Sequence, residues 1–192
     1  MDSLTVDQNE RICTLVTQAG QRAKQANQHE FGVFEKGIED YVTSVDQELD
    51  QYLSAGFADL FPQDGIVTEE NQASCQAFQA CPERLWLIDP IDGTEEFIHK
   101  GDGYAVMVGL LERYQPRAGW VYAPERETLY WGGQGWGIVS VGTSGAARAA
   151  AAPMSDATLR TVLSTAVGQP RPKALWRCDR TLFAHRSMLF PR

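Results

Sequence analysis

The sequence lacks any long apolar run. No stretch approaches the roughly 18 consecutive apolar residues that a membrane-spanning helix requires. The polar N-terminus also lacks the apolar segment of a signal peptide. We therefore expect a cytoplasmic protein with no membrane partner.

Basic residues are scarce as well. The chain has 17 Lys and Arg against 25 Asp and Glu, which gives a formal net charge of −8. This excess of acid argues against a protein that binds nucleic acid polymers or anionic membrane surfaces. A small phosphorylated partner stays compatible with the charge, because bound metal ions can invert the local sign.

Cysteine is sparse and shows no regular spacing. The chain has four cysteines, Cys13, Cys75, Cys81 and Cys178, and none of them forms a C-x-x-C pair. This spacing implies neither a zinc site nor a disulfide framework. The length of 192 residues suits one ordinary domain with a sizeable core.

The most informative stretch is residues 85–97, Leu-Trp-Leu-Ile-Asp-Pro-Ile-Asp-Gly-Thr-Glu-Glu-Phe. Its apolar start is typical of a buried strand, and a turn at Asp92 and Gly93 leads into a short helix from Thr94. Asp89 and Asp92 are therefore expected on one strand-to-helix turn, where carboxylate and carbonyl oxygens suit a hard cation such as Mg²⁺. The free amides of Gly93 and Thr94 suit a phosphate. Two ordinary turns with no ligand are the alternative.

Three elements together resemble the inositol monophosphatase superfamily. They are Asp-Pro-Ile-Asp-Gly-Thr at 89–94, Gly-Ile-Val-Thr-Glu-Glu at 65–70, and Thr-Ser-Val-Asp at 43–46, in the family's order and at family-like spacing. The family has a glycine where this chain has Thr68, which is a mild departure because threonine is favoured in strands. The resemblance implies an Mg²⁺-dependent phosphate monoester hydrolase that Li⁺ inhibits, with two or three Mg²⁺ ions in the intact family.

The resemblance also implies roles for particular residues. The metal ligands would be Glu69, Asp89, the carbonyl of Ile91 and Asp92. The catalytic residues would be Asp46, Thr94 and Glu69, with Asp46 orienting the Thr94 hydroxyl, and the Gly93 and Thr94 amides would bind the phosphate. Glu70 would support Glu69, and Lys36 is the candidate for a lysine that reaches towards the site, with a solvated loop lysine as the alternative.

Periodicity predicts an α+β fold, and the resemblance implies the layered sandwich of the family, whose N-terminal half has two helices packed on an antiparallel sheet. Thr43 and Ser44 are candidate caps for the second helix. The expected helices are 3–28 and 45–60, and the expected strands are 31–34, 41–43, 66–68, 85–89, 104–111, 118–122, 128–131 and 136–141. The segment 71–84 reads as a surface excursion, and 142–153 has the composition of a linker.

We expect residues 1–150 to form an N-terminal domain that binds metal and phosphate. Residues 151–168 would begin a truncated C-terminal α/β half, because the family's Trp-Asp-x-x-Ala element is absent. Residues 169–192 hold six basic side chains against one acidic side chain. We expect this basic tail to be disordered, either as the product of a truncated or shifted reading frame or as a binding segment for an anionic partner.

Three functions stay open. The stretch 95–104 looks closer to 3'(2'),5'-bisphosphate nucleotidases, which act on 3'-phosphoadenosine 5'-phosphate, and we favour that substrate. The string Phe-Ile-His-Lys at 97–100 equally resembles inositol-1-monophosphatases. The third option is a truncated, catalytically impaired family member that binds metal and phosphate without turnover. A small phosphorylated molecule is the expected partner in each case, with a homodimer as an open option.

Overall fold

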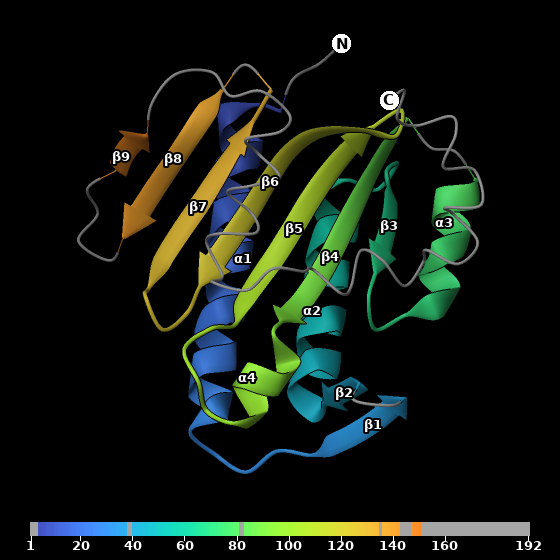
Figure 1. Cartoon of the computed structure of the whole chain (residues 1–192). Helices are drawn as coiled ribbons and strands as arrows, with labels where there is room; N and C mark the ends of the chain where they lie inside the picture. The colour runs from blue at the N-terminus through green and yellow to red at the C-terminus, as the bar shows by residue number, and fades with distance from the viewer. Residues whose placement is uncertain (1–3, 38–39, 81–82, 135, 143–146, 151–192) are drawn as a thin grey trace, which may run out of the picture.

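A computed structural model describes residues 4–37, 40–80, 83–134, 136–142 and 147–150 (Figure 1). Its helical elements are α1 (Val6–Asn27), α2 (Ser44–Leu60), a 3₁₀ turn η1 (Gln72–Ser74), α3 (Cys75–Gln79) and α4 (Thr94–Ile98). Its strands are β1 (Val33–Gly37), β2 (Asp40–Thr43), β3 (Gly65–Thr68), β4 (Arg84–Asp92), β5 (Ala105–Glu112), β6 (Gln115–Ala123), β7 (Thr128–Gly133), β8 (Gly137–Gly142) and β9 (Ala147–Ala150).

Seven strands form one sheet in the order β3-β4-β5-β6-β7-β8-β9, and β1 pairs with β2 in a separate hairpin. Five of the six neighbouring pairs in the large sheet are antiparallel, as predicted, but β3 and β4 are parallel. Parallel neighbours need a crossover connection, and η1 and α3 supply it. The segment expected as a surface excursion thus contains η1 and α3, and α3 has no buried residue.

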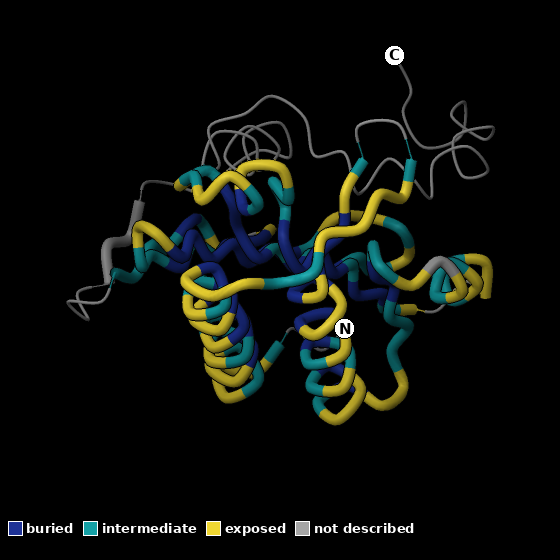
Figure 2. Tube along the Cα trace, turned by 90° about the horizontal axis from the view of Figure 1, so that it is seen from below, coloured by how far each residue is buried: buried dark blue, intermediate teal, exposed yellow. Residues whose placement is uncertain are grey.

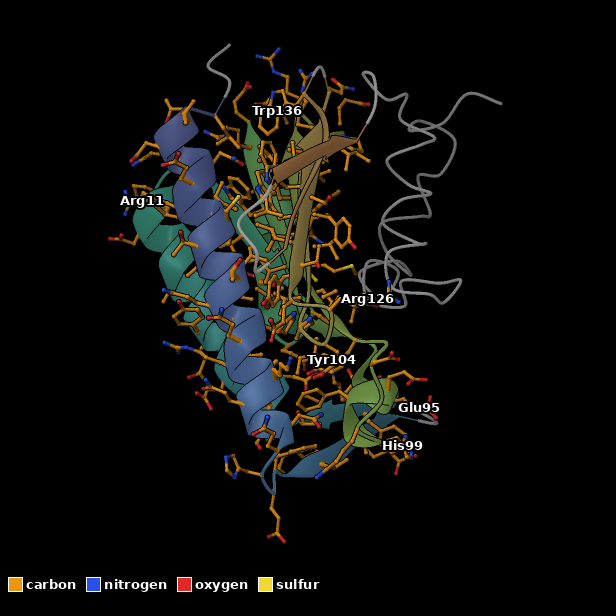
Figure 3. The ribbon with its side chains drawn as sticks, turned by 90° about the vertical axis from the view of Figure 1, so that its left-hand side faces the viewer. Arg11, Glu95, His99, Tyr104, Arg126 and Trp136 are labelled. Atoms are coloured by element: carbon orange, nitrogen blue, oxygen red, sulfur yellow. The ribbon has the colours of Figure 1, made fainter. Side chains whose placement is uncertain are left out.

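Both long helices lie on the same face of the sheet (Figure 3). The prediction of an α+β fold with two helices on a sheet is thus confirmed. The core between these layers joins Ile12 and Val16 of α1 to Leu53 of α2 and to the fully buried Trp86 and Trp120 of the sheet. Figure 2 shows exposed residues on the outer faces of the helices and buried residues in the sheet layer.

Each long helix begins with a capping box. The Thr5 hydroxyl accepts a hydrogen bond from the Gln8 amide at the start of α1, and the Thr43 hydroxyl accepts from Val45 and Asp46 at the start of α2. These bonds satisfy amides that have no partner within the helix. Thr43, rather than Ser44, is therefore the cap of α2.

Three expectations differ from the structure. The first predicted strand begins two residues later than expected, at Val33. The segment read as a linker contains β9, which pairs with β8 through the backbone. Cys75 is disulfide-bonded, although the cysteine spacing implied no disulfide framework, while Cys13 is a free thiol.

The expectations for residues 151–168 and 169–192 fall outside the described residues. In the part of the chain that the structure describes, no helix is both long enough and apolar enough to span a membrane.

Candidate active site

The site residues meet at one edge of the sheet, where β3 and β4 end side by side. Thr68 is the register partner of Ile88, and the Glu69 amide donates to the Ile88 carbonyl at 3.1 Å. Because β3 and β4 are parallel, their carboxyl ends lie together. Glu69, just after β3, is therefore brought beside Asp89 on β4, with which its carboxyl group interacts.

A bulge in β4 gives Asp89 and Asp92 a common side. Asp89 pairs with Met107 and Asp92 pairs with Ala105, so three steps along β4 match two steps along β5. Side chains of a regular strand alternate between faces, which would place residues three apart on opposite faces. The extra residue cancels that alternation. The spacing of the two aspartates in the sequence therefore becomes a convergent pair.

Asp46 connects the start of α2 to the start of α4. Its Oδ1 accepts a hydrogen bond from the Thr94 hydroxyl at 3.2 Å, as the sequence analysis expects. Its Oδ2 accepts from the Thr43 amide at 2.9 Å and, at short range, from the Thr43 hydroxyl. The Thr94 hydroxyl also lies 3.1 Å from the Ile91 carbonyl oxygen. These bonds hold the Thr94 hydroxyl beside the carboxylates.

Burial sets the electrostatics of these groups. It is the main cause that raises the pKa of Glu69 to about 7 and that of Asp92 to about 6. Burial also raises the pKa of Asp89 well above its usual value, and the nearby Glu69 and Asp92 carboxylates add to that shift. Burial raises the pKa of Asp46 too, partly offset by hydrogen bonds from Thr43. A positive charge at this position would reverse these shifts.

Asp89 offers the clearest test of whether the site suits a cation. Both of its carboxylate oxygens are buried, and apart from the neighbouring acid Glu69 they have no hydrogen-bond partner among the described residues. An unpaired buried carboxylate is strongly unfavourable, whereas a hard cation would satisfy both oxygens. The donor set of carboxylate and carbonyl oxygens is the one that Mg²⁺ prefers. The residues present therefore fit this ion.

The oxygen donors proposed for the metal ion do not surround a common point. Within the described ranges, no group of three or more Asp, Glu, His or Cys side chains is arranged to hold a metal ion. The carboxyl side chains instead interact in pairs, such as Glu69 with Asp89. Like charges at short range repel one another, so such a set is expected to close only around a cation.

The β1–β2 hairpin brings a lysine to the same edge. The Lys36 ammonium lies 2.6 Å from a Glu70 carboxylate oxygen and 3.9 Å from a Glu69 oxygen. Of the two interpretations of Lys36, the structure thus places it at the carboxylates rather than in a solvated loop. Glu70 is oriented by this ion pair next to Glu69.

Sequence reasoning missed Asp50. This residue is 8% exposed, and its Oδ1 is buried without a partner among the described residues. It interacts with Thr68 and with the charge of Lys36. Its position four residues after Asp46 places both carboxylates on one face of α2, and that spacing could have indicated it.

Gly93 makes the turn into α4 possible. Its backbone has φ +90°, which side-chain-bearing residues rarely adopt. A β-carbon at this position would also lie 2.9 Å from the Gly103 carbonyl oxygen. At the other end of α4, the buried Asn27 side chain donates to the Phe97 carbonyl at 2.7 Å. The helix and the turn before it are therefore held at both ends.

Comparisons with known proteins show which family the sequence resembles. The sequence model of the inositol monophosphatase family matches residues 7–186. A 3'(2'),5'-bisphosphate nucleotidase of Aggregatibacter actinomycetemcomitans is 31% identical over 137 residues, which cover 71% of this chain and 51% of that protein. A fructose-1,6-bisphosphatase/inositol-1-monophosphatase of Aquifex aeolicus is 37% identical over 103 residues, which cover 54% of this chain and 38% of that protein.

Solved structures show the same fold. The Thermotoga maritima IMPase aligns with a TM-score of 0.62 at 25% identity, covering 70% of this chain and 51% of that chain. An IMPase/NADP phosphatase complexed with Mg²⁺ and phosphate aligns with a TM-score of 0.61 at 26% identity, covering 69% and 49%. The chain spans about half the length of the curated relatives it matches.

Proposed function

The chain belongs to the inositol monophosphatase family, and on that premise we propose that its carboxylate site serves Mg²⁺-dependent hydrolysis of phosphate monoesters. The observation that carries the proposal is the Asp89 carboxylate, whose two oxygens are buried among acidic side chains with no basic group paired to them among the described residues. Its neighbours Glu69 and Asp92 are acidic as well. Such a site gains most from a divalent cation.

Four groups would hold the ion: the carboxylates of Glu69, Asp89 and Asp92 and the carbonyl of Ile91. When bound, Mg²⁺ neutralises charge on the phosphate and on the leaving oxygen. A family structure complexed with Mg²⁺ and another soaked in LiCl as an inhibitory complex support this cofactor and Li⁺ inhibition. We propose that Mg²⁺ is the cofactor of this chain, with two or three ions bound as in the intact family, and that Li⁺ inhibits it.

The protein's own groups would orient the reactants. Since the Thr94 hydroxyl donates to Asp46, its lone pairs remain available to accept a hydrogen bond from the attacking water. Glu69, whose carboxyl group interacts with that of Asp89, would take up a proton from this water. The amides of Gly93 and Thr94 would donate to the phosphate oxygens, which aligns the phosphorus with the water.

The favoured substrate is 3'-phosphoadenosine 5'-phosphate, with inositol 1-phosphate as the alternative. The first choice is supported by the nucleotidase of 31% identity. The second is supported by the Sus scrofa inositol monophosphatase 1, which is 28% identical over 159 residues. We also propose a cytoplasmic location, and a homodimer is an open option for the assembly.

Metal binding tests the site directly. Mg²⁺ at a hundredfold excess over its Kd should stabilise the folded protein by about 2.7 kcal/mol, which is roughly 5 to 10 °C in melting temperature for a domain of this size. Asp89→Asn should abolish this metal-induced rise. Asp59→Asn is the matched control, because Asp59 is 81% exposed and pairs only with Arg11 among the described residues. An equal rise in the Asp89 variant would refute the assignment.

The alternative function is that of a family member that binds metal and phosphate without turnover. Phosphate release from both substrates at saturating Mg²⁺ separates the two functions. A loss of about 4 kcal/mol in transition-state stabilisation would already lower the rate about a thousandfold. Robust turnover that Asp89→Asn removes would support the enzyme. Release no faster than in the variant, together with a Mg²⁺-induced rise in melting temperature, would support the binding protein.

A further inference from the structure

The turn between β6 and β7 lies at the same edge of the sheet as the carboxylates. Asp92 at the end of β4 pairs with Ala105, and Val106 pairs with Tyr122, so the end of β6 lies level with the start of β5. Ala123 is therefore two strands away from Asp92, about 10 Å at the usual spacing. The residues that follow Ala123 stand beside the candidate site.

Arg126 is the centre of this turn, and its two acidic neighbours face away from it. The Glu125 carboxylate accepts a hydrogen bond from the Tyr104 hydroxyl at 2.8 Å, and Lys24 of α1 contacts both Glu125 and Glu127. These contacts draw both carboxylates to the side of the sheet that carries α1. Figure 3 shows Arg126 on the opposite side, above α4.

The Arg126 guanidinium has no ion pair or side-chain hydrogen bond with any residue that the structure describes, and Arg126 is exposed. Its backbone, however, is fixed. The Thr128 hydroxyl donates to the Arg126 carbonyl at 2.8 Å, and the Glu127 amide closes the turn on the Pro124 carbonyl at 3.1 Å. An exposed, unpaired cation is thus presented from a defined turn beside an acidic site.

We propose that Arg126 forms a subsite for a second anionic group, a phosphate, on the substrate whose first phosphate lies at Asp89 and Asp92. The inference rests on the proposed function and deepens it by naming the residue that would select substrates with two phosphates over those with one. The planar guanidinium donates two parallel hydrogen bonds to one phosphate, which gives direction as well as charge. Lys36 does not compete for this role, because Glu70 already pairs with it.

Two ligands that differ only in the second phosphate test the subsite. Binding of 3'-phosphoadenosine 5'-phosphate and of adenosine 3'-monophosphate would be measured by calorimetry in Mg²⁺ for the wild type, Arg126→Gln and Arg11→Gln. Arg11 lies on the helix side of the molecule (Figure 3) and its removal changes the net charge equally. Its variant controls for long-range electrostatics.

We expect the wild type and Arg11→Gln to prefer the bisphosphate. Arg126→Gln should weaken bisphosphate binding about tenfold to a hundredfold, the usual range for one hydrogen bond to a charged group, and leave the monophosphate unchanged. Equal binding of both ligands by the wild type, or an unchanged preference in Arg126→Gln, would overturn the subsite alone. Binding of neither ligand to the wild type would overturn the proposed function and the subsite together.

Discussion

Gly93 shows how one backbone conformation shapes the site. Its positive φ lets β4 turn into α4 directly after Asp92, and its lack of a side chain lets the turn pass close to the Gly103 carbonyl. The positive φ and the close approach to Gly103 both require glycine at this position. The position of the Thr94 hydroxyl depends on this turn.

Gly93→Ala should therefore destabilise the protein by about 2 kcal/mol or more, because alanine is strained at this φ and its β-carbon meets backbone that cannot easily move. Urea unfolding provides the measurement. Gly109→Ala is the control, since a β-carbon there would make an ordinary contact of 3.9 Å with Leu87. If both variants unfold at the same urea concentration, the turn is less constrained than the structure indicates.

The start of α2 joins an element of the fold to the chemistry of the site. Thr43 caps the helix and also donates to Asp46, which in turn holds Thr94. Thr43 is fully buried. The capping box of α1 has the same design at Thr5, but its hydrogen bonds are exposed. The two helices thus offer the same motif with and without a link to the site.

Thr43→Ala should lower the free energy of unfolding by about 2 kcal/mol, because it removes the cap and leaves buried Asp46 with fewer donors. Thr5→Ala should lower it by about 1 kcal/mol or less. Thr43→Ser keeps the hydroxyl and should restore most of the loss. Chemical denaturation of the three variants checks the ranking, and equal losses for Thr43→Ala and Thr5→Ala would contradict it.

For the whole molecule, the carboxylate cluster couples stability to pH. In the unfolded chain, Glu69 and Asp92 would ionise near their ordinary pKa values of 4.5 and 3.8. In the folded protein, burial raises the pKa of Glu69 to about 7 and that of Asp92 to about 6. The folded state therefore binds more protons than the unfolded state between these limits, and stability falls as the pH rises through them.

The metal-free protein should accordingly lose stability between pH 5 and pH 8, by on the order of 3 kcal/mol from this cluster. Urea unfolding in the presence of a chelator at several pH values measures the slope. A Glu69→Gln, Asp89→Asn double variant should flatten the slope, because it removes two of the carboxyls that share the buried charge. A wild-type slope of the opposite sign would show that other groups dominate.

Much of the local structure could be read from the sequence. The periodicity of α1 and α2 and the apolar run of β4 depend on residues close together in the chain, and their elements are found within a few residues of the predicted bounds. The three family-like strings identified the family that the comparisons show. The predicted hydrogen bond between Thr94 and Asp46 is present in the structure.

Other features depended on contacts between distant segments. β9 has no strand pattern of its own and forms by pairing with the edge of β8. Local composition predicted a linker there, because backbone hydrogen bonds to a neighbouring strand leave no mark in the sequence. The ion pair of Lys36 on β1 with Glu70, just after β3, likewise depends on contact between distant segments.

The residues of the candidate site could be read from the sequence. Local chemistry indicated the carboxylates and the glycine of the turn at 89–94, and the family resemblance added Asp46, Glu69 and the Ile91 carbonyl. The convergence of these residues on one site could not be read from the sequence. The parallel pairing of β3 with β4 brings Glu69 to Asp89, and the bulge opposite β5 turns Asp92 to the same side. Register between strands is decided by the packing of whole faces against the helices. The candidate metal site could therefore be named residue by residue from the sequence, but only the folded protein assembles it.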